Sequence, residues 1–294
     1  MPNANLSAYL QLHLIVFIWG FTGVLGEIIQ LEPARLTWFR LLLAAVFLLA
    51  YLLVKKVDLR VTRKDLLQLT GVGVLIGIHW ILFFQAIDVS NVSVTLALFS
   101  TGAFLAAILE PLFYGRKMLW YELLFGLCII SALYLIVEAE FHYITGMILA
   151  FCSVLFGVIF TLFNGKLTQR HDSSVITMYE FFAAFGFVCV YLAVTDGFHA
   201  DFFELSIQDW WLMLLLASVC TSYAFTASVQ VMRKLTPYTV MLTTNLEPVY
   251  GIVMAYFIIG GKERMSLPFY IGALVIVAVV IANGIVKHRL RNSA

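Results

Sequence analysis

The sequence has few charged residues and lacks the motifs of nucleotide-dependent and hydrolytic proteins. Asp, Glu, Lys and Arg make up 12% of its 294 residues, against about 25% in soluble domains. The net charge is +1 and no basic cluster alternates with aromatic residues, so a nucleic-acid partner is not expected. No Walker loop is present, so direct use of ATP would need a partner protein. HExxH and GxSxG are also missing, and the pair His171-Asp172 falls in a loop, which disfavours an enzyme.

Cysteine is scarce and shows no ligand or redox spacing. All four cysteines fall inside apolar runs, without a CxxC pair or a histidine at metal-ligand spacing: Cys128, Cys152, Cys189 and Cys220. Free cysteines in such positions usually pack as small apolar side chains. The sequence therefore predicts neither a metal site nor a cofactor.

Long apolar runs dominate the chain instead. Hydrophobic residues make up 62% of it and the mean hydropathy is +0.97. Lipid offers no hydrogen bonds to a backbone, so a spanning element must be a helix or part of a closed barrel. Barrel strands alternate apolar and polar residues, whereas residues 41–54 and 271–286 are almost continuously apolar. Membrane-spanning helices are therefore expected.

Ten stretches have the length and polarity of such helices. A span needs about 20 apolar residues to cross the hydrocarbon core. The stretches between polar breaks are residues 8–29, 35–54, 66–87, 92–114, 119–138, 143–164, 174–195, 209–232, 238–259 and 267–286. The expected fold class is an all-α integral membrane protein with ten transmembrane helices.

The charges in the loops predict an orientation, because basic residues concentrate in cytoplasmic loops. With the N-terminus inside, only Arg35, Lys262 and Arg264 fall on the outer side. Fourteen fall on the cytoplasmic side: Lys55, Lys56, Arg60, Arg63, Lys64, Arg116, Lys117, Lys166, Arg170, Arg233, Lys234, Lys287, Arg289 and Arg291. We expect a multi-pass protein of the cytoplasmic (inner) membrane with both termini in the cytoplasm. The oligomeric state stays open, and a monomer is sufficient.

A weak internal repeat divides the chain in two. An offset of 146 residues places DVSNVSVTLAL (88–98) on KLTPYTVMLTT (234–244), and one of 140 places Thr37-Trp-Phe-Arg40 on Thr177-Met-Tyr-Glu180. Identities are few, but the offset agrees with the span boundaries. Five spans per repeat is an odd number, so the halves must have opposite orientations, as in many secondary transporters.

The predicted domains follow from this repeat. The first five-helix repeat covers residues 8–138 and the second covers 143–286, and residues 287–294 form a short basic cytoplasmic tail. In inverted-repeat transporters the substrate binds where the halves meet near the middle of the membrane. The same location is expected here.

Several short motifs occur in a characteristic order. They are Trp19-Gly20, Arg40, the Ala86-Ile-Asp-Val-Ser-Asn-Val-Ser93 passage, Asn245-Leu-Glu-Pro248 and the Gly260-Gly-Lys-Glu263 turn. Together with the ten-span frame, they resemble the EamA-type family of the drug/metabolite transporter superfamily over essentially the whole chain. The resemblance implies export of small metabolites. It also implies a cavity lined by the third, fourth, eighth and ninth helices with parts of the first and sixth.

One departure bears on the mechanism. The first repeat has Glu110-Pro111, nine residues beyond the position that matches Glu247-Pro248 under the offset of 146. Nine residues is about two and a half helical turns. A symmetric mechanism with two equivalent carboxylates is therefore in doubt.

Glu247 and His79 are the leading candidates for binding substrate or protons. Both fall near the middle of a predicted span, where a lipid-facing charge costs on the order of 3 kcal/mol. Pro248 can leave backbone acceptors free near Glu247, and Trp80 beside His79 would extend an aromatic wall. The alternative is structural: a carboxylate paired with a neighbouring helix, and a hydrogen-bonded packing histidine.

Other residues are weaker candidates. Ser100, Thr101, Thr221, Ser222, Gln230 and Asn245 reach similar depths, and Trp19 and Tyr223 could provide stacking surface. An ion pair between Glu27 and Arg40 is expected, with anion binding by Arg40 as the alternative. Glu110 and Glu180 are expected to be gate or interface partners. The glycines Gly73 and Gly77 indicate close helix packing.

These observations favour a secondary transporter that moves a small metabolite, an amino acid or a related compound, by alternating access. Export is the favoured direction, and proton coupling through Glu247 or His79 is one hypothesis. A passive facilitator or channel shares the same features, and a membrane-embedded enzyme is the less favoured alternative.

Overall fold

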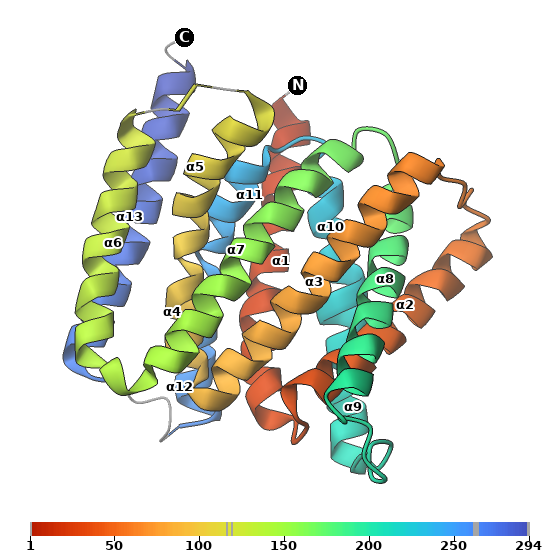
Figure 1. The fold of residues 1–294 in the computed structure, drawn as a ribbon. Helices are drawn as coiled ribbons and strands as arrows, with labels where there is room; N and C mark the ends of the chain where they lie inside the picture. Colours follow the sequence, from red (N-terminus) through yellow and green to blue (C-terminus); the bar gives the residue numbers. More distant parts are fainter. Residues whose placement is uncertain (1, 116, 119, 261–264, 293–294) are drawn as a thin grey trace.

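The computed structural model describes residues 2–115, 117–118, 120–260 and 265–292, and these form helices and short connections without a strand. The elements in order are α1 (Pro2–Ile28), α2 (Pro33–Lys55), α3 (Arg63–Val89), α4 (Val92–Phe99), α5 (Thr101–Tyr114), α6 (Trp120–Ala139), η1 (Phe141–Tyr143), α7 (Ile144–Leu167), α8 (Ser173–Val194), α9 (Ile207–Leu215), η2 (Leu216–Tyr223), α10 (Ala224–Val231), α11 (Pro237–Thr244), α12 (Glu247–Ile258) and α13 (Leu267–Asn292). Figure 1 shows them as one bundle with both termini at the same end.

Each of the ten predicted ranges is occupied by helix. Among the described residues, seven helices are long and apolar enough to cross a membrane. Shorter apolar stretches lie in α6 and α13, at Leu124–Ala139 and Leu267–Val279. Helix α13 runs on to Asn292, so the predicted tail is largely helical. Arg116 and residues 261–264, which include all of the predicted Gly260–Glu263 turn except Gly260, lie outside the described part of the chain.

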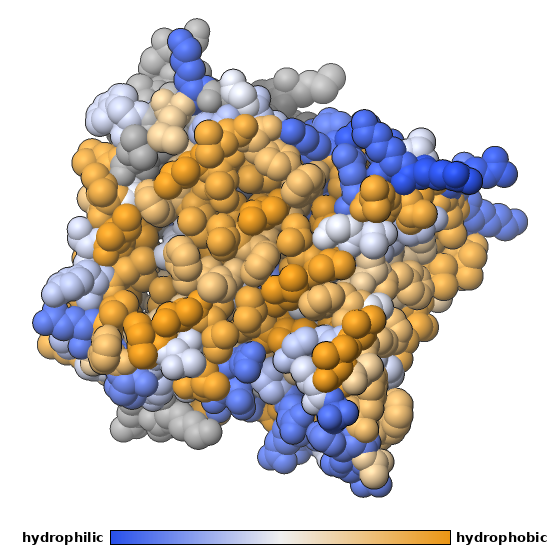
Figure 2. Space-filling view, in the orientation of Figure 1, coloured by the Kyte–Doolittle hydropathy of each residue, from blue (hydrophilic) through white to orange (hydrophobic). Residues whose placement is uncertain are grey.

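The outer surface of the bundle is apolar along the helices. Figure 2 shows a broad hydrophobic area, with hydrophilic residues gathered mainly toward the ends of the bundle. Large apolar side chains face outward from several helices, including Val54, Leu112 and Phe257. Such a surface is stable when it contacts lipid rather than water.

Two of the predicted spans are broken helices. Helices α4 and α5 meet at Ser100, and α11 and α12 meet at Asn245-Leu246. The offset of 146 places Ser100 on Leu246. Both segments also begin with a side-chain cap: Asn91 Oδ1 accepts from Val94 N, and Thr236 Oγ1 accepts from Thr239 N. The aligned segments therefore share one local plan.

Helix packing is alike in the two halves. Helix α3 packs on α7 and α8, and α9, η2 and α10 together pack on α1 and α2. Helix α12 packs on α1 and α4, while α5 packs on α7 and α11. Helix α6 packs on α13, and α2 packs on α8. Exchanging the halves converts each of these contacts into another one named here, except that α6 on α13 and α2 on α8 each convert into themselves.

The prediction that Gly73 and Gly77 allow close packing is confirmed. A Cβ atom added at Gly73 would lie 2.4 Å from the backbone oxygen of Glu180 and 2.6 Å from Cβ of Ala183. One added at Gly77 would lie 2.8 Å from a ring carbon of Phe187. Without side chains at these positions, α3 approaches α8 closely.

A polar cluster joins the α7–α8 turn to the start of α3. The buried carboxylate of Asp65 accepts from Thr62 Oγ1 at 2.8 Å and from Arg170 Nη1 at 3.0 Å, and His171 Nε2 lies 2.9 Å away. Thr62 in turn caps the helix by accepting from Asp65 N. The cluster thus ties these two segments together at one end of the bundle.

Replacing Asp65 with alanine is expected to lower the melting temperature in detergent by several degrees, because Arg170 and His171 lose their shared acceptor. The matched control is Asp58→Ala, which removes an exposed carboxylate 3.9 Å from Arg60 and should have little effect. Thermal unfolding followed by tryptophan fluorescence measures both. Equal melting temperatures for the two variants would contradict the structural role of Asp65.

Candidate functional site

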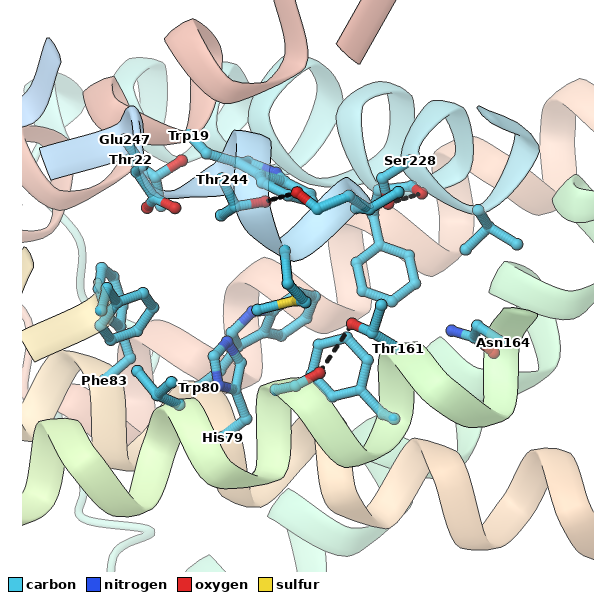
Figure 3. Close-up of a pocket in the computed structure, with 18 of the residues that line it drawn as sticks. Trp19, Thr22, His79, Trp80, Phe83, Thr161, Asn164, Ser228, Thr244 and Glu247 are labelled. Atoms are coloured by element: carbon cyan, nitrogen blue, oxygen red, sulfur yellow. Dashed lines mark hydrogen bonds between the residues drawn. The ribbon is translucent and has the colours of Figure 1, made fainter. Parts of the chain in front are cut away.

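A cavity lies where the two halves meet. Its walls come from α1, α2, α3 and α4 on one side and from α7, α10, α11 and α12 on the other. Its volume is about 90 Å³, several times the roughly 10–15 Å³ that one water molecule needs. In Figure 3, Glu247 and Thr22 lie at one end and Asn164 at the other, with His79 and Trp80 between them.

Arg40 supplies the cavity with a buried cation. Its guanidinium lies over the ring of Trp80, 4.0 Å from the centroid, and its side chain is almost fully buried. Its Nε donates to Thr221 Oγ1 at 2.7 Å, and Thr221 donates to the carbonyl of Leu216 five residues earlier. Its Nη1 has no hydrogen-bond partner within the described residues. Arg40 therefore has one buried donor without a partner in the described part of the chain.

Thr221 is held in place by an unusual stretch of helix. Leu216–Tyr223 is a π-helix, and such segments occur often at functional sites. Its wider turn lets the Thr221 hydroxyl bond the carbonyl five residues back while accepting from Arg40. The second half of the chain thus orients a cation from the first half.

Glu247 supplies the opposite charge. It is the first residue of α12, directly after the break at Asn245-Leu246, and only 5% of it is exposed. Neither a hydrogen bond nor an ion pair within 4.0 Å engages its carboxylate in the described part of the chain. Two opposite charges therefore line one cavity without bonding each other directly.

The expected ion pair between Glu27 and Arg40 does not form, which corrects that prediction. Arg40 lies about two turns into α2 and points toward Trp80 and Thr221 instead. The short connection between α1 and α2 brings Glu27 near the start of α2. This connection does not determine which neighbouring helix the side chain of Arg40 faces.

Aromatic rings form much of the remaining wall. They come from Trp19, Trp80, Phe83, Phe99, Phe160 and Phe225. His79 lies among them, with ring centroids 5.3 Å from Phe160 and 5.9 Å from Phe99. Its Nδ1 is 2.7 Å from the backbone oxygen of Ser153, and Ser153 Oγ donates to the His79 carbonyl at 2.8 Å. These bonds anchor the imidazole to α7.

The structure brings some predicted residues to the cavity and leaves others away from it. Trp19, His79, Trp80 and Glu247 line it, and so does Arg40. Ser100, Thr101, Ser222 and Asn245 are buried outside its lining. Ser222 donates to the carbonyl of Ala44, and Thr101 to that of Leu98. Asn245 lies at the α11–α12 break with both amide atoms unpartnered among the described residues.

Tyr223 and Gln230 require a correction, because both are exposed rather than lining the cavity. Gln230 was chosen for its depth along the span and Tyr223 for its aromatic ring, and neither property says which face of the helix a residue occupies. The π-helical turn before α10 also changes the angular position of the residues after it. Phe225 and Ser228 take the lining positions on α10.

The two remaining acidic candidates lie behind the lining. Glu110 accepts from Tyr238 N at the start of α11, at 3.1 Å. Glu180 accepts from Asn164 Nδ2 at 3.2 Å. The structure adds cavity residues that sequence reasoning missed, notably Val154, Gly157, Thr161 and Asn164 on α7. Their spacing of three and four residues is a helical stripe that could have been found.

An apolar helical bundle around a buried cavity with charged and aromatic walls is typical of a membrane transporter. The chain belongs to the EamA-like transporter family, whose model matches it twice, over residues 6–138 and 144–284. The resemblance inferred from the short motifs is thereby confirmed. The protein is a multi-pass membrane protein of the drug/metabolite transporter superfamily, and its family consists of transporters rather than enzymes.

A solved structure supports the fold. It is described only as the crystal structure of a protein, and it matches with a TM-score of 0.71 over 97% of this chain and 98% of that chain. Its sequence identity is 15%, so the likeness concerns the fold alone. No curated protein matches the chain.

Proposed function

We propose that the protein is a secondary transporter for a small zwitterionic metabolite, an amino acid or a close relative, with export as the favoured direction. The observation that carries this is the presence of Arg40 and Glu247 in one aromatic cavity without a direct bond between them. Buried charges are costly unless they are paired. A ligand with a carboxylate and an ammonium group would pair both at once.

The ligand's orientation follows from the positions of the two charges. The substrate carboxylate would accept from Arg40, whose Nη1 is unpartnered, in the planar geometry that suits guanidinium groups. The ammonium would face Glu247, and the indole of Trp19 lines the same cavity. An apolar side chain would contact Phe99, Phe160 and Phe225. A ligand lacking either charge would leave one buried group unpaired.

Alternating access would arise from two inverted repeats, residues 8–138 and 143–286. The matched helix breaks and the exchangeable packing support this arrangement. In Figure 1, α1 runs away from the end that holds both termini and α7 runs toward it. Together with the loop charges, these features support ten spans, an inner-membrane location and cytoplasmic termini. Rocking of one half against the other would expose the cavity to each side in turn.

Counterflow in proteoliposomes tests the proposal. Vesicles loaded with an unlabelled L-amino-acid mixture should take up a labelled mixture. Amines and carboxylic acids with the same side chains, which carry only one of the two charges, should compete poorly with the labelled amino acids. Equal competition by singly charged analogues would refute zwitterion recognition. A passive facilitator would carry the same ligands but would never concentrate them against a gradient, and that comparison separates the two classes.

Replacing Glu247 with glutamine is expected to weaken competition by amino acids roughly 10- to 100-fold, since hydrogen bonds to charged groups contribute about 1.5–3 kcal/mol. Competition by the matching carboxylic acids, which have no ammonium group, should change little. Glu110→Gln is the matched control, because Glu110 is buried but lies outside the cavity lining. If Glu247→Gln weakened both ligand classes equally, Glu247 would not be the ammonium partner.

A further inference from the structure

Glu180 is a fully buried carboxylic acid outside the proposed substrate site. It lies on α8 with 0% of its surface exposed. Asn164 Nδ2 donates to its Oε2 at 3.2 Å, while its Oε1 has no hydrogen-bond partner within the described residues. Asn164 itself lines the cavity. Glu180 therefore lies directly behind one cavity residue.

No cation among the described residues forms an ion pair with this carboxylate. The charged and histidine side chains on the elements that pack against α8 are Arg63, Lys64, Asp65, His79 and Asp88 on α3, Arg35, Arg40 and Lys55 on α2, and Lys166 on α7, while α10 has none. Over the described part of the chain, none of them forms an ion pair or a hydrogen bond with Glu180. An ionised group here would be buried without compensation, which proteins avoid.

One acceptor beside Glu180 also has no donor. Asn164 Oδ1 is buried and, like Glu180 Oε1, has no hydrogen-bond partner among the described residues. It belongs to the amide that already donates to the carboxyl group. A proton on Oε1 converts this acceptor into a donor. It can then bond a neighbouring oxygen and neutralise the charge in the same step.

We propose that Glu180 is a proton-binding site of the transporter, reached from the cavity through Asn164 and separate from the substrate site. The step adds a proton to the carboxylate oxygen Oε1 and returns it to water when the helices move and hydrate the group. Figure 3 shows Asn164 at the end of the cavity opposite Glu247. This proposal rests on the proposed transport function and assigns its coupling ion.

A chain of rings connects the two sites. Phe181 follows Glu180, and its ring centroid is 5.6 Å from that of Trp80 and 5.2 Å from that of Phe225. Trp80 carries the guanidinium of Arg40 on its face. A shift of α8 on proton release would therefore move the aromatic wall against the cation that binds substrate.

Proteoliposomes with wild type, Glu180→Gln and Glu110→Gln test this assignment. Glutamine mimics the protonated acid and cannot release a proton. Glu180→Gln should keep counterflow of a labelled L-amino-acid mixture within about twofold of wild type but lose accumulation driven by a pH gradient. Glu110→Gln should keep both. The proposal would be overturned if Glu180→Gln accumulated amino acids under a pH gradient as well as wild type does. It would also be overturned if a sodium gradient, and not a proton gradient, drove accumulation by the wild type.

An infrared measurement separates this proposal from the substrate assignment. The wild type at neutral pH should show a carboxylic-acid C=O band that is missing in Glu180→Gln and present in Glu110→Gln. If amino acids gave no counterflow in any variant, the proposed substrate class would fail, yet the band would still report the proton on Glu180. A wild-type spectrum without this band would refute the proton site whatever the substrate is.

Discussion

Arg40→Met is expected to lower the affinity for a zwitterionic amino acid by roughly 10²- to 10⁴-fold. Two hydrogen bonds to a charged group contribute about 1.5–3 kcal/mol each, and 1.4 kcal/mol corresponds to a factor of ten. Methionine keeps the bulk of the side chain without the charge. Because Trp19 and Trp80 line the cavity, quenching of tryptophan fluorescence on titration with amino acids measures the affinity directly.

Two further variants make the Arg40 prediction specific. Arg40→Lys keeps the charge but loses the planar fork and the stacking on Trp80, so its affinity should be intermediate. Arg35→Met is the control: Arg35 is also on α2, but it binds the carbonyls of Asp201, Phe202 and Glu204 instead of lining the cavity. The affinity of Arg35→Met for amino acids should match that of the wild type. Unchanged binding by folded Arg40→Met protein would remove the central support for the proposed function.

Gly73→Leu is expected to prevent correct folding. Even the first atom of a side chain at this position would lie 2.4 Å from the Glu180 backbone oxygen, and a backbone cannot rotate away as a flexible side chain does. Overpacking of this kind costs about 1–3 kcal/mol for a few extra carbons, and a whole leucine should separate α3 from α8. Gel filtration of the detergent extract should show aggregated protein in place of a single symmetric peak.

Gly71→Leu is the matched control, two residues earlier on the same helix. Nothing lies within 4 Å of a Cβ atom added at Gly71, so leucine there should face open space. This variant should elute as wild type and keep its melting temperature. If both leucine variants folded equally well, the close approach of α3 to α8 would be wrong. Gly73→Ala should give an intermediate melting temperature.

The helices could be predicted because their signal is local. A membrane helix satisfies its own backbone hydrogen bonds, so a run of apolar residues is enough to indicate one. The ten predicted ranges all hold helix in the structure, and the glycine pair on α3 marked a real contact. Even the breaks at Ser100 and Leu246 agree with an offset read from the residues alone.

The site was only partly predictable, because its chemistry depends on contacts between distant segments. Depth along a span selected Glu247 and His79, which line the cavity, but depth also selected Gln230 and aromatic character selected Tyr223, and both are exposed. A shared position near the outer ends of the first two spans suggested Glu27 as the partner of Arg40, whereas Arg40 contacts Trp80 and Thr221, the latter 181 residues away. Helix rotation and a π-helical turn, neither visible in hydropathy, decided these outcomes.

The sequence by itself therefore determined the all-helical membrane class, the positions of the helices and the family, because each depends on local composition or on motif order. Only the tertiary structure decided which buried charges share a cavity and which stand alone. Arg40 and Glu247 come from different halves, and Glu180 is left with an amide as its partner. Such pairings depend on how helices rotate and cross, and packing between distant segments sets that geometry.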